Sequence, residues 1–334
     1  MDKSINISLL DLGIVVEGQS TPEALGEIVY NAQYIESLGY KRIWIAEHHN
    51  NATTSTAATA VLIGHIAEKT TTLRVGSGGI MLPNHTPLAV AEQFGTLDML
   101  YPGRIDLGLG RAPGTDRLTA AALRRDNISA TYHFPEDVMS LQQFFSKENS
   151  NAKVRALPGE GRNIPIWILG SSTDSAYLAA EYGLPYVFAS HFAPGQLFEA
   201  IDIYKKNFKP LPSHDKPYLM VGANVIVAET NDRAAFLKTS LEQLMFGFVT
   251  GNPKPLPPPV KHLPAIFSRP DVKQALDNMT YYTFHGDKEK IRIQVEDFME
   301  KTQADELFIT NYIYDKTARF KSFELLADAM GLNN

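Results

Sequence analysis

The sequence predicts an α/β fold of the (β/α)8 class, a TIM barrel. Strand-like apolar runs alternate with helical patterns along the 334 residues in units of about 30 residues, which favours a parallel sheet with right-handed crossovers. Eight strand candidates occur, each followed by a helical pattern. No G-x-G-x-x-G follows the first strand, and Pro113 stands where Gly108-Leu109-Gly110 would need a third glycine, so a doubly wound sheet is disfavoured. We expect a single domain over residues 1–334.

The first half of the chain contains four strand–helix units. Thr21-Pro22 opens the first helix, because threonine caps helix N-termini and proline is tolerated in the first turn. Gly39 ends this helix. We predict strands over residues 5–10, 42–46, 73–77 and 104–109, and helices over residues 21–38, 55–69 and 87–100.

The second half continues the alternation, and two segments fall outside it. Residues 112–163 form a polar, partly helical insertion. Residues 251–271 contain seven of the 20 prolines, a composition that propagates neither a helix nor an inner strand. We therefore predict insertions after strands 4 and 7, the second a mobile loop over residues 251–286 that acts as a lid, with a passive surface loop as the alternative. Strands are expected over residues 164–169, 185–189, 218–228 and 306–310, and helices over residues 172–182, 194–208, 232–247 and 317–330.

The composition excludes several classes of protein. With 44% hydrophobic and 20% charged residues, the chain is typical of a globular protein with a large core. A net charge of -6 leaves no broad basic field, so no nucleic-acid partner is expected. The absence of cysteine excludes disulfides, thiolate nucleophiles and cysteine-ligated metals. No signal pattern or membrane-length apolar run occurs, so we expect no membrane partner and a cytoplasmic location.

The segment Gly103–Asp116 indicates an anionic ligand. A strand ends here at Gly110, which leaves room for a flat ligand against the backbone. Arg111 follows, and its fork of donors suits a phosphate group. Pro113-Gly114 then turns the chain.

A second candidate for anion binding is the turn Gly170-Ser171-Ser172-Thr173-Asp174-Ser175, between a strand and a helix. Backbone N–H groups and serine hydroxyls at a helix N-terminus bind anions, although serine also caps helices without any ligand. Together with Arg111 on the neighbouring strand, phosphate binding is the better explanation.

The ends of the other strands supply the remaining candidates, because active sites of TIM barrels lie at the C-terminal ends of their strands. Glu47-His48-His49 ends the second strand, and only one of two adjacent histidines can face the barrel axis. That histidine is a candidate general base or ligand-orienting group, with a structural pair or a metal site of Asp11, His48 and His191 as alternatives. Gly78-Gly79 ends the third strand, where a ligand lies flat on the backbone or a bulge forms.

Other histidines and the tryptophans are assigned structural roles. His65 lies within a largely apolar helical pattern, and His85 lies in a loop before Pro87. Trp44 and Trp167 fall inside strands, where core packing is expected.

Four motifs, in order, resemble the bacterial luciferase-like flavin monooxygenases, most closely the single-chain alkanal-monooxygenase-like branch. They are Trp44–His49, Val75–Pro83, Gly103–Asp116 and Pro165–Ser172. The resemblance covers essentially the whole chain. It implies a (β/α)8 barrel, usually a homodimer, that binds FMN at the C-terminal ends of the strands.

The resemblance also implies roles for individual residues. Arg111, Ser172 and Ser175 would hold the FMN phosphate, with Gly170 and Ser171 adjoining. Gly78-Gly79 falls on a non-proline cis peptide beneath the flavin ring in this family. His48 matches the catalytic histidine. Asp11, His49 and His191, at strand ends, are expected to line the substrate pocket, and no metal is expected.

The implied activity is a monooxygenase reaction in which reduced FMN and O2 oxidise a small organic substrate such as an aldehyde. Reduced FMN would come by diffusion from a separate flavin reductase, since no nicotinamide fingerprint occurs. Two departures from luciferase, Gly110 in place of a cysteine and Ser171 in place of a glutamate, put light emission in doubt. The alternatives are a non-catalytic flavin-binding protein, a deazaflavin-dependent oxidoreductase and a metal-dependent hydrolase.

Overall fold

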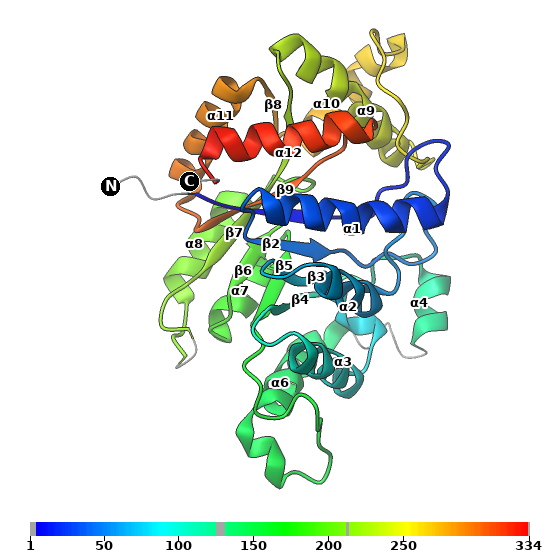
Figure 1. Cartoon of the computed structure of the whole chain (residues 1–334). Helices are drawn as coiled ribbons and strands as arrows, with labels where there is room; N and C mark the ends of the chain where they lie inside the picture. Colours follow the sequence, from blue (N-terminus) through cyan, green and yellow to red (C-terminus); the bar gives the residue numbers. More distant parts are fainter. Residues whose placement is uncertain (1–4, 125–130, 212–213, 333–334) are drawn as a thin grey trace.

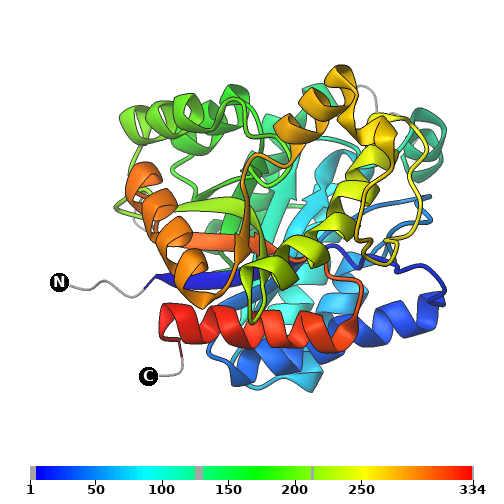
Figure 2. The same cartoon turned by 90° about the horizontal axis from the view of Figure 1, so that it is seen from above.

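The computed structural model describes residues 5–124, 131–211 and 214–332. Within these ranges eight parallel strands close into a barrel with helices around it, which confirms the predicted TIM barrel (Figure 1, Figure 2). Each strand pairs with the next, β9 returns to β1, and β7 pairs with both β6 and β9. The barrel strands are β1 (Asn6–Asp11), β2 (Arg42–Ile45), β3 (Arg74–Met81), β4 (Ile105–Gly110), β5 (Ile166–Gly170), β6 (Tyr186–Phe188), β7 (Leu219–Val227) and β9 (Glu306–Thr310).

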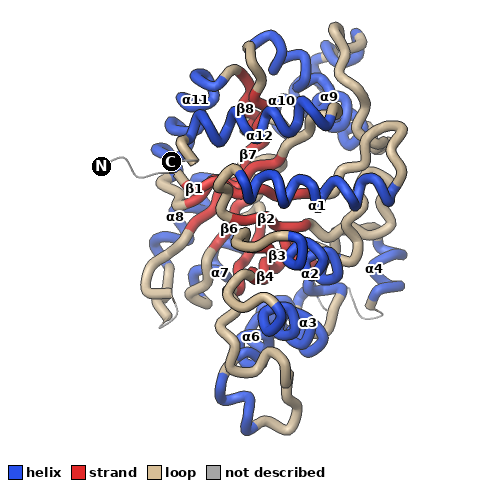
Figure 3. Tube along the Cα trace, in the orientation of Figure 1, coloured by secondary structure: helices blue, strands red, loops and turns tan. Residues whose placement is uncertain are grey.

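Helices cover the outside of the barrel, as the separation of helix and strand in Figure 3 shows. In α1 the residues Ala24, Ile28, Ala32 and Ile35 are buried, a spacing that directs one apolar face toward the strands. The described helices include none that is long and apolar enough to span a bilayer. The helices on the outside of the barrel include six that follow barrel strands and one that precedes β9. The six are α1 (Thr21–Ser37), α2 (Thr59–Lys69), α3 (Pro87–Leu100), α7 (Thr173–Glu181), α8 (Leu197–Asn207) and α12 (Lys316–Met330), and the helix before β9 is α11 (Lys288–Thr302).

Two boundaries in the first half differ from the prediction. The second helix begins at Thr59, four residues later than expected, because the preceding residues bond to the loop after β1: the Ser55 N–H donates to the Gly13 carbonyl at 2.8 Å. The third strand runs on to Met81, with a register shift against β4 between Ser77 and Ile80.

The predicted insertion after the fourth strand is present and partly helical. It contains α4 (Arg117–Leu123), α6 (Phe134–Phe145) and a 3-10 turn, η2 (Lys147–Asn151). In α6 the apolar residues Phe134, Val138, Leu141 and Phe145 are buried, so this insertion packs onto the body of the protein.

The insertion after β7 is more structured than the predicted loop over residues 251–286. It begins with α9 (Asn231–Val249) and continues through η3 (Ala265–Ser268), α10 (Pro270–Met279) and β8 (Thr283–Gly286). The loop prediction was wrong for the second part because most of the prolines lie before residue 265, and Pro270 stands in the first turn of α10, where its missing N–H is not needed. Val272 and Leu276 of α10 are buried. The mobility of residues 250–264 stays a prediction.

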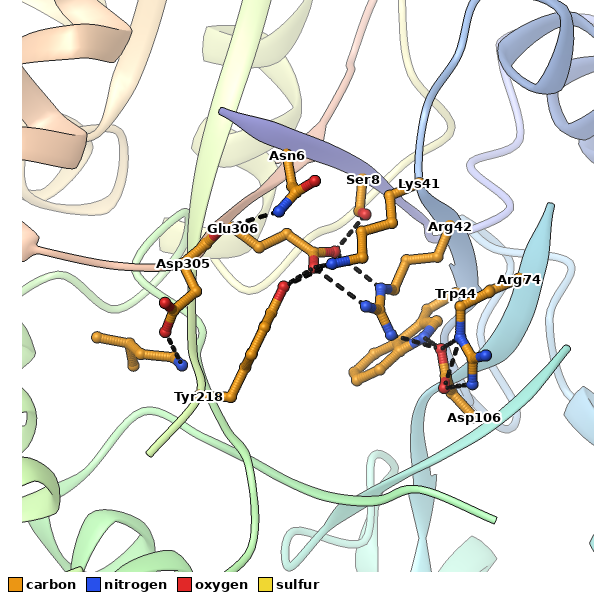
Figure 4. A network of polar contacts seen from close by, with 11 residues as sticks. Asn6, Ser8, Lys41, Arg42, Trp44, Arg74, Asp106, Tyr218, Asp305 and Glu306 are labelled. Atoms are coloured by element: carbon orange, nitrogen blue, oxygen red, sulfur yellow. Dashed lines mark hydrogen bonds and ion pairs between the residues drawn. The ribbon is translucent and has the colours of Figure 1, made fainter. Parts of the chain in front are cut away.

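A buried ion-pair network fills the N-terminal end of the barrel (Figure 4). Arg42 bridges two carboxylates from different strands, Asp106 on β4 at 2.7 Å and Glu306 on β9 at 2.8 Å. Arg74 pairs with Asp106, and the Tyr218 hydroxyl donates to Glu306 at 2.8 Å. This network joins the first residues of strands on opposite sides of the barrel.

Aromatic side chains occupy the next layer of the barrel interior. Trp44 packs edge-on against Trp167 and Phe308, with ring centroids 5.3 and 5.1 Å apart. The Trp44 indole N–H donates to Asp106 at 3.1 Å, so its polar group is satisfied within the network below. The core-packing role predicted for both tryptophans is confirmed. With the network, these rings close the barrel below its C-terminal end.

Candidate functional site

His48 lies just beyond the end of β2, at the C-terminal end of the barrel. Its backbone N–H donates to the Thr56 carbonyl at 2.9 Å, which holds the strand end against the following loop. The imidazole Nδ1 is buried and has no hydrogen-bond partner among the described residues. Burial lowers the pKa of His48 and His49 lowers it further, while Glu47 opposes the shift. A neutral imidazole with an unused nitrogen can accept a proton near neutral pH.

The neighbouring His49 and Glu47 belong to a different cluster. Glu47 is 1% exposed, and its Oε1 accepts hydrogen bonds from the Nε2 atoms of His49 at 2.8 Å and His85 at 2.9 Å. Its Oε2 accepts from the Met81 backbone N–H at 3.1 Å. Burial acts to raise the pKa of Glu47, but these hydrogen bonds outweigh it and lower the pKa to about 2. The carboxylate is therefore ionised at neutral pH.

This cluster was not predicted from the sequence. Glu47, His49 and His85 bring three potential metal-ligating atoms within 4.8 Å of one another, although His85 was assigned a structural role in a loop. The alternative metal set is not assembled: in the described residues the ligating atoms of Asp11, His48 and His191 do not gather within that distance. The motif Glu47-His48-His49 signalled a reactive strand end, but no local pattern linked it to His85.

Asp11 has its partners on the side of β1 that faces α1. Its carboxylate accepts hydrogen bonds from the Asn31 side chain and the Gly13 backbone N–H, both at 2.8 Å. It lines a cavity of about 30 Å³, the size of one water molecule, together with residues of α1 and α12. These contacts account for Asp11 as a structural group, and its predicted place in the substrate pocket gains no support from them.

His191 follows β6 and is 7% exposed. A Cβ added to Gly222 on β7 would stand 2.4 Å from the His191 Nδ1, so only glycine leaves room for this ring. The Asn224 side chain donates to the His191 carbonyl at 2.8 Å. Burial lowers the pKa of His191 to about 4, and its Nδ1 has no partner among the described residues. The site thus contains a second neutral imidazole with an unused nitrogen.

Gly78-Gly79 lies on β3, where the two glycines are joined by a cis peptide bond. The resemblance implied this bond at this position, and the structure contains it. The strand is tightly packed here: a Cβ on Gly79 would stand 2.9 Å from the Gly108 carbonyl oxygen on β4. Similarly, a Cβ on Gly110 would stand 2.7 Å from the Met81 sulfur. These glycines allow β3 and β4 to approach closely near their C-terminal ends.

The predicted anion site brings together Arg111 and the N-terminus of α7. Arg111 is exposed at the end of β4, and its guanidinium lies 3.4 Å from the carboxylate of Asp174 in the first turn of α7. Ser172 is the N-cap residue of α7, and no side-chain cap hydrogen bond is formed there. The guanidinium of Arg111 and the uncapped N–H groups at the start of α7 are suitable hydrogen-bond donors for a phosphate.

Ser175 differs from the other serines of this turn. Its hydroxyl donates to the Ser172 carbonyl at 2.6 Å and pairs with the Tyr186 hydroxyl at 2.9 Å. A Cβ on Gly170 would stand 2.1 Å from this hydroxyl, which explains the glycine that precedes the turn. Ser175 therefore supports the turn from within, whereas Ser171 and Ser172 are half-buried in the turn itself.

A larger cavity lies under the proline-rich segment. Its volume is about 560 Å³, and aromatic and apolar side chains contribute most of its lining together with Glu17 and Gln243. Phe246 of α9 and Phe267 stack here with ring centroids 4.6 Å apart. A bridge between Val16 and Leu256 ties this segment to the loop after β1.

Known proteins resemble this chain over most of its length. A family model described as luciferase-like monooxygenase matches residues 8–248. A luciferase-like monooxygenase of Escherichia coli (strain K12) is 48% identical over 327 residues, which are 98% of this chain and 97% of that protein. An N-acetyl-S-alkylcysteine monooxygenase of Bacillus subtilis (strain 168) is 37% identical over 69% of this chain and 70% of its own.

Solved structures show the same fold. Apo-MsnO8 superimposes with a TM-score of 0.88 at 31% identity, covering 98% of this chain and 99% of its own. The oxygenating constituent of 3,6-diketocamphane monooxygenase from Pseudomonas putida, in complex with FMN, has a TM-score of 0.71, with 16% identity and 98% of both chains covered. An F420-dependent secondary alcohol dehydrogenase reaches 0.69 at 15% identity, covering 99% of this chain and 100% of its own. Proteins of this fold thus use either FMN or F420.

Proposed function

The chain belongs to the luciferase-like monooxygenase family, and on this premise we propose that it is an FMN-dependent monooxygenase. It would use reduced FMN and O2 to oxidise a small organic substrate such as an aldehyde. The main observation that supports this proposal is the contact between Arg111 and the first turn of α7. This contact lies at the C-terminal end of the barrel. F420 and FMN both carry phosphate, so this contact supports a phosphorylated flavin, and the motifs resembling the FMN branch favour FMN.

The residues present fit such a cofactor. Arg111, Ser171, Ser172 and the first N–H groups of α7 would hold the phosphate, and Ser175 would support their turn. The flat Gly78-Gly79 segment, free of side chains, would lie beneath the flavin ring. Two buried imidazoles at the same end of the barrel have nitrogens without partners among the described residues, and a bound ligand would supply those partners.

Each protein group then has a definite task. When bound and reduced, the flavin supplies the electrons that activate O2. His48 is held at its backbone by Thr56, and its neutral imidazole accepts or returns a proton at Nδ1. His191 would face the ligand as a neutral hydrogen-bonding group, because its pKa of about 4 prevents protonation at neutral pH. His49, bound to Glu47, would border the pocket.

The experiment is a comparison of flavin binding and oxygen use. Binding of FMN and reduced FMN to the wild type, Arg111→Lys and Arg111→Ala is measured by fluorescence and calorimetry. We expect Arg111→Ala to weaken binding about 10- to 100-fold, since a hydrogen bond to a charged group contributes about 1.5–3 kcal/mol, and Arg111→Lys to fall between. Equal affinity of Arg111→Ala and the wild type would refute the phosphate assignment.

The products of the reaction with O2 distinguish the function from its alternatives. The wild type is mixed anaerobically with chemically reduced FMN, and O2 is added with each member of a panel of aldehydes. Free reduced FMN itself consumes O2 and yields H2O2, so monooxygenation predicts a carboxylic acid product formed in place of H2O2 when an aldehyde is present. Binding of FMN without turnover would favour a flavin carrier. Preference for F420 with no O2 uptake would favour a deazaflavin oxidoreductase.

We also propose that the protein acts as a homodimer and receives reduced FMN by diffusion from a separate flavin reductase. Light scattering after gel filtration measures the oligomeric state. Turnover supported by an unrelated reductase, with a rate that follows the free concentration of reduced FMN, would support diffusion.

A further inference from the structure

The carboxylate of Glu47 connects three strand ends at the C-terminal end of the barrel. Glu47 itself follows β2 and precedes His48. It accepts the Met81 backbone N–H at the end of β3, two residues after the cis Gly78-Gly79 peptide. It also accepts the side chain of Asn84 at 3.3 Å, and Asn84 donates in turn to the Pro113 carbonyl at 2.8 Å, in the loop after β4. Pro113 is two residues from Arg111.

Independent hydrogen bonds join the same segments farther out. The Thr115 hydroxyl donates to the His49 carbonyl at 2.9 Å. The Asn50 side chain donates to Asp116 at 3.2 Å and to Thr119 at 3.1 Å. The His48 segment is therefore bonded to the Arg111 loop directly as well as through the Glu47 carboxylate.

The protonation of the cluster follows from its hydrogen bonds. An ionised carboxylate can only accept, so the Nε2 atoms of His49 and His85 must both carry hydrogen when they bond to Glu47. A carboxylate that is 1% exposed needs such donors, because a buried charge without partners is costly. The donors belong to the chain segments that surround the site. The hydrogen bonds that stabilise the Glu47 carboxylate therefore also fix the positions of these segments.

We propose that Glu47 is a positioning residue that holds the His48 imidazole, the Gly78-Gly79 segment and the Arg111 loop as one rigid unit. His48 then stands in register with a flavin ring and phosphate bound by the other two segments. The inference rests on the proposed function, since it assigns to Glu47 the alignment of the groups that bind and use the flavin. Glu47 acts through its neighbours and touches none of the reacting atoms.

A metal site with two histidines and one carboxylate would have the same composition as the cluster of Glu47, His49 and His85. The hydrogen-bond interpretation is favoured because the Met81 N–H and the Asn84 amide share the carboxylate with the two histidines. These two donors bring β3 and the β4 loop to Glu47, a role that ligation alone does not require. The hydrogen-bond interpretation requires an N–H at Nε2 of His85, whereas metal ligation requires a lone pair on that nitrogen.

The first test uses Glu47→Gln, His85→Gln and His85→Ala, with Glu199→Gln on α8 and His65→Gln on α2 as exposed controls. Glu47→Gln should lower kcat about 100-fold, because small misplacements of catalytic groups cost rates of this order, and should weaken FMN binding severalfold. Glutamine at position 85 still offers an N–H, so His85→Gln should keep most of the activity that His85→Ala loses. Both controls should match the wild type.

Contrary results are equally specific. Wild-type kcat and FMN affinity in folded Glu47→Gln would refute the positioning role. If Glu47→Gln does not fold, the pair of His85 variants decides: equal loss in both, together with a stoichiometric transition metal in the wild type that His85→Ala lacks, would replace the hydrogen-bond cluster with a metal centre.

A second measurement needs no flavin. Nitrogen-15 NMR of the histidine side chains should show His49 and His85 as Nε2–H tautomers in the wild type at pH 7, and a changed state of both rings in Glu47→Gln. If the wild type shows these tautomers but neither binds FMN nor uses O2, the proposed function fails and the Glu47 cluster stands. If it binds FMN and turns over while the rings are Nδ1–H, the inference fails and the function stands.

Discussion

The ion pairs at the N-terminal end of the barrel differ from the two buried histidines at its C-terminal end in how their polar atoms are satisfied. At the N-terminal end, Arg42 and Arg74 face Asp106 and Glu306, and each charge has an opposite charge beside it (Figure 4). At the C-terminal end, His48 and His191 are largely buried, yet the Nδ1 atom of each has no partner among the described residues. Most buried polar groups in a fold have partners, so the two unpaired imidazole nitrogens are candidates for hydrogen bonds to a ligand.

The pKa directions repeat this contrast. Burial acts to raise the pKa of Asp106, but Arg42 and Arg74 outweigh it and lower the pKa. For His191 burial acts alone and lowers the pKa to about 4. Charge pairing thus keeps the Asp106 carboxylate ionised, whereas burial keeps the His191 imidazole neutral.

The largest effect is expected at His48. His48→Gln keeps the backbone hydrogen bond to Thr56 but removes the proton-accepting ring, so turnover should fall about 10²- to 10⁴-fold, the usual contribution of a general acid–base group. Stability and FMN affinity should change little. Stopped-flow O2 uptake measures the rate, with His65→Gln as control. A variant as fast as the wild type would remove His48 from the chemistry.

The next effect concerns the N-terminal end. Asp106→Asn leaves Arg42 and Arg74 without one of their carboxylates and should lower the free energy of unfolding by about 3–5 kcal/mol, as is usual when one partner of a buried pair is removed. Urea denaturation measures it. The control is Asp297→Asn, which removes an exposed pair with Lys301 and should cost under about 1 kcal/mol. Comparable losses in both variants would contradict the network's role.

Acidification should destabilise the protein through His191. The unfolded chain binds a proton on this histidine near its ordinary pKa of 6.5, whereas the folded protein does so only near pH 4, so stability is lost as the pH falls from 6.5 to 4. The loss from this group is at most about 3 kcal/mol. Denaturation of the wild type and His191→Gln across this range measures it, and the variant should show the smaller pH dependence. Parallel curves would show that the ring is solvated.

The smallest effect should occur at Asp174. Its carboxylate competes with a bound phosphate for Arg111, so Asp174→Asn should tighten FMN binding about two- to fivefold, with the opposite sign to Arg111→Ala. The gain should shrink at high salt, because both side chains are exposed. Weaker binding by the variant would mean that Asp174 orders the phosphate site.

The predicted strands agree with the structure where apolar alternation was strong. The eighth barrel strand was expected over residues 306–310 and is Glu306–Thr310. Arg111 and the serine turn were correctly assigned to neighbouring strands, since β4 pairs with β5. The prediction missed the four-residue strand β8 and the helix α10. Both are short, follow a proline-rich segment and are stabilised by packing against β7 and α9, so their local sequence gives only a weak signal.

The sequence by itself determined the barrel, the order of its strands and the end of the barrel at which His48, Gly78-Gly79 and Arg111 lie. These features follow from local periodicity and from the rule that parallel strands end on one side. Only the tertiary structure decided the partners of each polar side chain. It joined Glu47 to His85, 38 residues away, and turned Asp11 toward Asn31. Such hydrogen bonds depend on distances between segments far apart in the chain, which no local pattern encodes.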